Sequence, residues 1–177
     1  MPQLIFQRLS AWDVAYAIDM AIAAVITYCL MMFILPLVMN RPTDSVGVLW
    51  AVISTVFVFR DTRAHSLSAG LSRLVATFVS FALCLMYLAL FPANPLAMIV
   101  LITIGTLIMM VLGRRDDIGL TAITTAVVLI VAASVSQDAW QQPFLRLLDT
   151  IVGIAVGVAC KWIASFLFYR VVGAQTR

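Results

Sequence analysis

The sequence is poor in charge and in the residues that build catalytic sites. Its 177 residues contain no glutamate, one histidine and three cysteines, and charged residues make up 11% of the chain. No Ser-His-Asp arrangement and no Gly-Lys-Ser or Gly-Lys-Thr phosphate loop occurs, which argues against an enzyme and against nucleotide hydrolysis as an energy source. The cysteines lack metal-ligand spacing, so we expect no metal, no cofactor and no disulfide.

Apolar residues dominate instead, at 64% of the chain, and the mean hydropathy is +1.10. A soluble domain cannot bury that much apolar surface, whereas roughly 20 apolar residues cross a bilayer as a helix. The charged residues divide the chain into six apolar segments, at residues 14–39, 46–59, 67–91, 96–112, 118–135 and 144–169. The sequence therefore predicts an all-α, polytopic membrane protein with about six transmembrane helices. A single transmembrane domain spans residues 1–177, with a short interfacial segment at 1–12.

The basic residues between these segments predict the orientation, because cytoplasmic loops retain Lys and Arg. With the amino terminus inside, the cytoplasmic arginines are Arg8, Arg60, Arg63, Arg114, Arg115, Arg170 and Arg177, and Arg41 lies outside. We therefore expect a bacterial inner-membrane protein with both termini in the cytoplasm. The net charge of +3 follows from this topology and requires no nucleic-acid partner.

A repeated pattern links the third and sixth segments. Each carries an arginine, a threonine four residues later, and small residues seven and eleven later, namely Arg73, Thr77, Ser80 and Cys84 in one and Arg146, Thr150, Gly153 and Gly157 in the other. These offsets form one stripe on a helix, and small residues let helices pack closely, so we expect both stripes to face protein. With three spans in each half, the pattern predicts a 3+3 inverted repeat, a common transporter construction.

Three stretches carry a family resemblance. They are Leu49-Trp50-Ala51-Val52-Ile53-Ser54-Thr55, Leu-Ser-Ala-Gly70-Leu-Ser-Arg73, and Arg146-x-x-Asp-Thr150-x-x-Gly153-x-x-x-Gly157. Together they resemble the fusaric acid resistance and aromatic acid exporter superfamily, to which the plant malate channels are also similar. The chain departs from the superfamily pattern where Ala76 and Asp149 replace a first glycine and Ser80 replaces a second.

The resemblance implies an exporter of small organic anions, such as aromatic carboxylic acids, in the lipid bilayer. It also implies six-span modules that act in pairs, so we expect a homodimer. Proton exchange is the expected energy source. Two other interpretations stay open, a passive anion channel and a non-transporting scaffold within a larger complex.

Ionisable residues inside the spans are candidates for function, because a charge near the bilayer centre costs on the order of 3 kcal/mol. Arg73 and Arg146 are expected to bind the substrate carboxylate, with Thr77 and Thr150 beside them. A structural interpretation competes with this one. In it, Arg146 pairs with Asp149 one helical turn away, and Arg73 extends to the cytoplasmic headgroups.

A second pair is expected between Asp19 in the first span and Lys161 in the sixth, which lie at similar depths. The pair acts either as a proton-coupling site or as a static ion pair that sets helix register. Trp50 lies near a predicted span end, and we expect it to belong to an interfacial aromatic belt.

Overall fold

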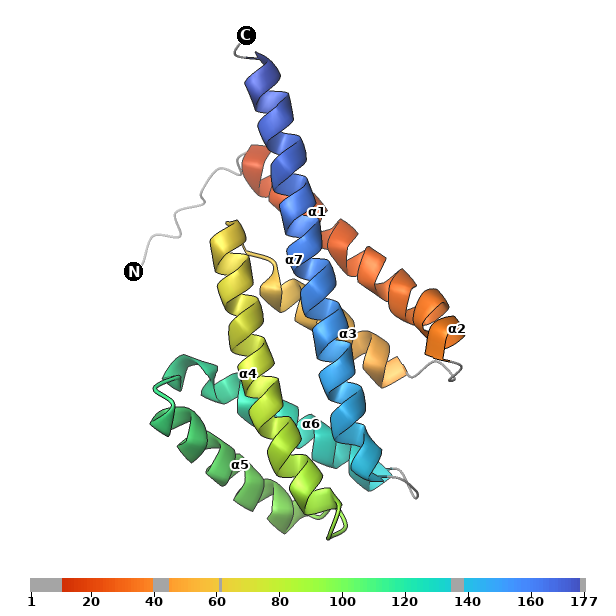
Figure 1. Ribbon diagram of the computed structural model, residues 1–177, viewed down its shortest axis with the longest axis vertical. Coiled ribbons are helices and arrows are strands. Elements are labelled where there is room, and N and C mark those ends of the chain that lie inside the picture. The colour runs from red at the N-terminus through yellow and green to blue at the C-terminus, as the bar shows by residue number, and fades with distance from the viewer. Residues whose placement is uncertain (1–10, 40–44, 61, 135–138, 176–177) are drawn as a thin grey trace, which may run out of the picture.

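The computed structural model describes residues 11–39, 45–60, 62–134 and 139–175, and within these ranges the chain is helical almost throughout (Figure 1). No strand forms in the described ranges, which confirms the predicted all-α class. The helices are α1 Ala11–Cys29, α2 Leu35–Met39, α3 Ser45–Val58, α4 Arg63–Leu88, α5 Pro95–Val111, α6 Ile118–Ser134 and α7 Gln142–Gln175. Short 3₁₀ turns, Arg115–Asp117 and Ala139–Gln141, precede α6 and α7.

Each predicted span falls on one helical segment. The largest difference is at the carboxyl end, where α7 continues to Gln175 and does not end at residue 169. Arg170 marks the end of an apolar run, but arginine is a good helix former and does not end a helix. Four stretches are long and apolar enough to cross a membrane, namely Trp12–Leu37, Arg63–Leu88, Arg115–Ser134 and Ala139–Phe166. The helices α3 and α5 are also apolar but shorter.

Local sequence explains where several helices begin, bend and end. Asn94 caps α5 by accepting a hydrogen bond from the backbone N–H of Ala97 at 2.7 Å. Gly113 follows α5 with a φ of 70°, a left-handed conformation that favours glycine. Pro36 has no backbone N–H to continue the α-helical pattern. The chain adapts through a π-helical turn, Leu30–Ile34, that joins α1 to α2 just before this proline.

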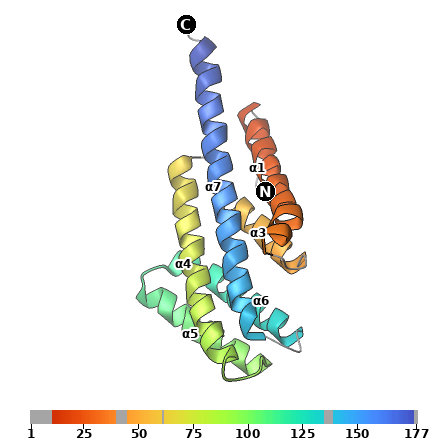
Figure 2. The same cartoon turned by 45° about the vertical axis from the view of Figure 1, so that its right-hand side comes forward.

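The antiparallel helices α4 and α7 form the centre of the molecule (Figures 1 and 2). In each half of the chain, the middle helix packs extensively on the third helix of the other half. Thus α3 lies along α7, and α6 lies along α4. The first helix of each half is peripheral, with α1 packed on α3 and α7, and α5 packed on α6 and α4. The packing of α3 on α7 and of α6 on α4 joins the two halves into one bundle.

Small residues permit the closest of these contacts. A Cβ added to Gly153 would collide with the carbonyl oxygen of Ala51 and would lie 2.6 Å from the Cβ of Ser54. A Cβ on Gly157 would lie 3.0 Å from the carbonyl oxygen of Thr55. The backbones of α3 and α7 are therefore packed as closely as glycine allows.

Hydroxyl groups reinforce both inter-half contacts. The Thr55 hydroxyl donates to the Gly153 carbonyl at 3.0 Å, and the Ser80 hydroxyl on α4 donates to the Thr121 carbonyl on α6 at 2.9 Å. Cys84, one turn beyond Ser80, is fully buried and belongs to the same hydrophobic cluster as Val128 of α6. The stripes predicted on the third and sixth segments thus face protein, and the small residues of each pack toward the middle helix of the other half.

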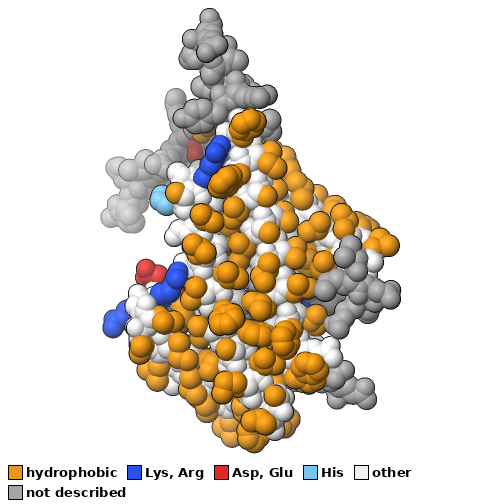
Figure 3. Space-filling model, in the orientation of Figure 1, with side chains coloured by type: hydrophobic (Ala, Val, Ile, Leu, Met, Phe, Trp, Pro, Cys, Tyr) orange, Lys and Arg blue, Asp and Glu red, His pale blue; other side chains and the backbone are white. Residues whose placement is uncertain are grey.

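The surface of the protein is apolar and part of its interior is polar. Figure 3 shows hydrophobic side chains covering the visible face, and charged groups only at a few places along its edge. The charged and hydroxyl side chains Arg73, Arg146, Asp149, Thr150 and Lys161 are all buried. An apolar exterior around buried polar groups is the distribution expected of a multi-pass membrane protein.

Candidate functional site

Arg73 lies in the interior of the bundle and does not extend to the surface. Its side chain is 4% exposed, and its Nε donates a hydrogen bond to the Ser54 hydroxyl on α3 at 3.0 Å. The guanidinium carbon lies 5.4 Å from the ring centroid of Trp50 and 5.0 Å from that of Phe57. The alternative in which Arg73 reaches the headgroups is therefore wrong.

No carboxylate lies within ion-pair distance of Arg73 in the part of the chain that the structure describes. One hydroxyl and two aromatic ring faces stabilise its charge. Cation–π contacts are worth only about 0.5–2 kcal/mol each. A buried cation ordinarily pairs with an anion, because removing a charge from water is costly. The site around Arg73 therefore carries a net positive charge, which a bound anion would neutralise.

Arg146 has a partner within its own helix. Its side chain is 1% exposed, and Nη1 lies 3.0 Å from Oδ2 of Asp149, three residues later on α7. The ion pair expected in the structural interpretation of Arg146 is thus formed. The Asp149 carboxylate also lies against the first turn of α3, where a Cβ on Gly47 would be 3.1 Å from both carboxylate oxygens. The amino-terminal end of a helix favours a negative charge, so α3 helps to hold this carboxylate.

Trp50 connects the two arginines. Its indole Nε1 donates to the Thr150 hydroxyl at 3.1 Å, and that hydroxyl donates to the backbone carbonyl of Arg146 at 2.8 Å. The same indole ring lies beneath the Arg73 guanidinium. Because Trp50 is only 5% exposed, its assignment to an interfacial belt is wrong. The sequence signal for its role is its position in the run Leu49–Thr55 that carries the family resemblance.

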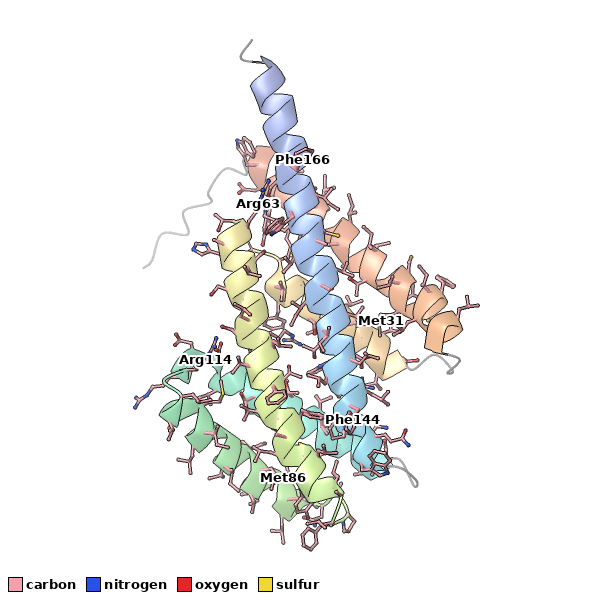
Figure 4. All side chains as sticks on the ribbon, in the orientation of Figure 1. Met31, Arg63, Met86, Arg114, Phe144 and Phe166 are labelled. Atoms are coloured by element: carbon pink, nitrogen blue, oxygen red, sulfur yellow. The ribbon has the colours of Figure 1, made fainter. Side chains whose placement is uncertain are left out.

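The two arginines lie on antiparallel helices, Arg73 on α4 and Arg146 on α7. Phe81 on α4 packs on Phe144 of α7 at 4.9 Å, and Gly70 faces Ile154, so the antiparallel register of α4 and α7 is fixed. Figure 4 shows Phe144 near the start of α7, at the end of the bundle opposite Arg63. At a rise of 1.5 Å per residue, this register separates the levels of Arg73 and Arg146 by roughly 9 Å.

We call these neighbouring residues the central cluster. Thr77 belongs to it by position, because it is buried one helical turn after Arg73. The cluster comprises Trp50, Ser54, Arg73, Thr77, Arg146, Asp149 and Thr150. It contains two arginines and one carboxylate, and it lies where α3, α4 and α7 meet.

Lys161 and Asp19 do not form the expected ion pair in the part of the chain that the structure describes. Lys161 is 8% exposed, and its Nζ lies 5.2 Å from the ring centroid of Tyr16 and 5.1 Å from that of Phe59. Tyr16 precedes Asp19 by about one helical turn, and its ring occupies the side of α1 that the ammonium group faces. Similar depth in the membrane does not by itself bring two side chains into contact.

Comparison with known families places the central cluster in a wider context. A family model described as fusaric acid resistance protein-like matches residues 44–160, which is most of the chain. The protein belongs to this family. No curated protein and no solved structure matches the chain significantly.

Membership of the fusaric acid resistance-like family indicates a membrane transport or efflux role, and a transporter in preference to an enzyme. The matched segment runs from just before α3 into α7 and contains the whole central cluster. Asp19 precedes the matched segment and Lys161 follows it directly. The cluster therefore lies wholly inside the segment of this fusaric acid resistance-like protein that matches the family model.

Proposed function

We propose that this protein exports small organic anions, with aromatic carboxylates as the substrate class, and that Arg73 binds the substrate carboxylate. The observation that carries the proposal is the burial of Arg73 without a carboxylate counterion in the described part of the chain. A substrate carboxylate would neutralise the charge of the Arg73 guanidinium. Arg73 uses only Nε in its hydrogen bond to Ser54, so the donors on its two Nη atoms are left for a planar carboxylate.

The surroundings of Arg73 favour an aromatic substrate. The rings of Trp50 and Phe57 lie beside the guanidinium and provide apolar, planar surfaces on which another ring can stack. A strongly hydrated inorganic anion would lose its water there without an equivalent gain. Thr77 and Thr150 are buried one helical turn after Arg73 and Arg146, respectively.

Proton exchange is proposed to occur at Asp149. The ion pair with Arg146 holds this arginine while Asp149 is ionised. For exchange, the substrate anion occupies the Arg73 site while Asp149 is ionised and paired with Arg146, and the emptied site returns with Asp149 protonated. One proton then moves inward for each anion that moves outward. This assignment replaces the pair of Asp19 and Lys161, which form no ion pair in the described part of the chain.

The packing of the helices supports an alternating-access mechanism. The two halves, α1 to α4 and α5 to α7, use equivalent contacts in which each middle helix packs on the other half's third helix. An inverted repeat has this arrangement, and it allows two mirror-related packings that open a central site to either side. We include in the proposal a homodimer in a bacterial inner membrane, with both termini in the cytoplasm.

The proposal is tested by the flux of radiolabelled benzoate in liposomes that contain the purified full chain. Wild-type protein is expected to export benzoate faster when a proton gradient opposes the direction of anion movement. Arg73→Gln removes the charge but keeps a polar side chain. Hydrogen bonds to charged groups contribute about 1.5–3 kcal/mol, so this change is expected to lower flux by about 10-fold or more. The matched control is Arg115→Gln, which removes the same charge from an exposed position outside the long helices.

Three outcomes contradict separate parts of the proposal. Wild-type flux in Arg73→Gln excludes the anion site. Flux that ignores the pH gradient excludes proton coupling and supports a passive channel. Benzoate that never crosses, in correctly folded wild-type protein, excludes this substrate class and supports a scaffold.

A further inference from the structure

We propose a second binding site for aromatic carboxylates, formed by Lys161, Tyr16 and Phe59 where α1, α3 and α7 meet. The substrate class rests on the proposed function, but the site is distinct from the central cluster. Its cation is Lys161, and its walls are the two rings that face the ammonium group. The proposal makes Lys161 a binding residue for the transported anion and not the partner of an internal carboxylate.

Lys161, like Arg73, is a buried cation. It is buried to more than nine-tenths, and in the described part of the chain no carboxylate lies within ion-pair distance of its ammonium group. The ring faces of Tyr16 and Phe59 lie against the ammonium group, with their centroids 5.2 Å and 5.1 Å from Nζ. Burial of a lysine with only ring faces as partners is unfavourable unless an anion joins it.

The end of α3 does not supply that anion. A cation near the carboxyl end of a helix is often explained by the free carbonyl groups there. At this helix end, however, the Phe59 carbonyl accepts a hydrogen bond from the Tyr16 hydroxyl at 2.9 Å. The Val58 carbonyl accepts one from the Ser66 hydroxyl at 2.8 Å. These side chains already satisfy the two carbonyls, so Lys161 is not required to do so.

The geometry separates this site from the central cluster. Arg73 contacts the ring of Phe57, whereas Lys161 contacts the ring of Phe59, two residues later on the chain. The two cations therefore contact different rings near the end of α3. Lys161 is also eleven residues beyond Thr150 on α7, or roughly 16 Å along the helix axis. The two sites thus lie at different levels along α7.

The rings also indicate the kind of anion. Tyr16 and Phe59 lie 5.5 Å apart at an interplanar angle of 54°, so they form two inclined apolar walls around the ammonium group. A benzoate-like anion can place its carboxylate on Nζ and its ring against these walls. Inorganic phosphate would lose hydrating water against the same rings, and one ammonium group would not offset that cost. A substrate bound at Lys161 would occupy a site next to the Arg73 site, near the end of α3.

The number of binding sites tests the inference. Purified full chain in neutral detergent is dialysed to equilibrium against radiolabelled benzoate, and the bound molecules per chain are counted. Wild type and the control Arg115→Gln are expected to bind two. Lys161→Met is expected to bind one, and Lys161→Arg, which keeps the charge, is expected to bind two. Phenylacetate is expected to displace benzoate from both sites, and inorganic phosphate from neither.

The outcomes separate this inference from the proposed function. Two benzoate molecules on folded Lys161→Met overturn the second site, while loss of one molecule in Arg73→Gln still supports the central site. Retention of both molecules in Arg73→Gln overturns the proposed function instead. Displacement from the Lys161 site by phosphatidylglycerol but not by phenylacetate overturns the inference and identifies the position as a lipid-headgroup site. Thermal unfolding of each variant confirms that the comparison concerns folded protein.

Discussion

The close approach of α3 and α7 predicts that alanine is not tolerated at Gly153. The added methyl group would collide with the Ala51 carbonyl oxygen and come within 2.6 Å of the Ser54 Cβ. The first obstacle is backbone and cannot rotate away, so the two helices must separate. Separation also stretches the 3.0 Å hydrogen bond from Thr55 to the Gly153 carbonyl.

The size of the effect follows from these two losses. Overpacking a tight contact costs about 1–3 kcal/mol. A lost hydrogen bond adds about 0.5–1.5 kcal/mol. Alanine offsets about 1 kcal/mol of this, because it has a higher helix propensity than glycine. We therefore expect Gly153→Ala to lower the free energy of unfolding by about 1–3 kcal/mol.

Gly119→Ala in α6 is the matched control. Nothing lies within 4 Å of a Cβ built at Gly119, so this variant gains helix propensity without a collision. It is expected to be as stable as wild type, or more stable by up to about 1 kcal/mol. Both free energies are measured by denaturant unfolding in the same detergent micelles. Equal stability of the two variants would refute the close packing of α3 on α7.

Two further predictions concern the central cluster. Asp149→Asn leaves Arg146 buried without its ion-pair partner and is expected to lower the free energy of unfolding by about 3–5 kcal/mol. Adding Arg146→Met is expected to recover part of that loss, and a double variant less stable than Asp149→Asn would contradict the pairing. Trp50→Phe removes the hydrogen bond to Thr150 but keeps a ring beneath Arg73. It is expected to cost about 1 kcal/mol in the same unfolding assay and to lower benzoate flux less than Arg73→Gln does.

Most of the helical architecture could be predicted from the sequence. Apolar runs divided by Arg60, Arg114 and Arg115 predict the helices, because lipid requires continuous apolar segments with internal backbone hydrogen bonds. The spacing of arginine, threonine and small residues predicts the buried stripes of α4 and α7, because residues four, seven and eleven positions apart lie on one side of a helix. Which helices those stripes contact could not be predicted, since every helix in the bundle offers an apolar surface.

The composition of the site could be predicted only in part. Arg73 and Arg146 are conspicuous because charge is rare in apolar segments, and Asp149 follows from its position one turn after Arg146. Trp50 could not be placed from depth alone, because a tryptophan near a span end suits both an interface and a buried site. The expected ion pair between Asp19 and Lys161 was wrong because similar depth in the membrane does not determine which sides of two helices face each other.

The central claim is that an organic anion binds beside the buried Arg73. The most direct measurement is a crystal structure of the full chain with 4-iodobenzoate, in which the iodine atom gives an anomalous scattering peak. The account predicts a carboxylate on the Arg73 guanidinium and an iodine peak among the rings of Trp50 and Phe57, absent from Arg73→Gln crystals. Full occupancy elsewhere with no ligand at Arg73, or an unchanged peak in the variant, would contradict it.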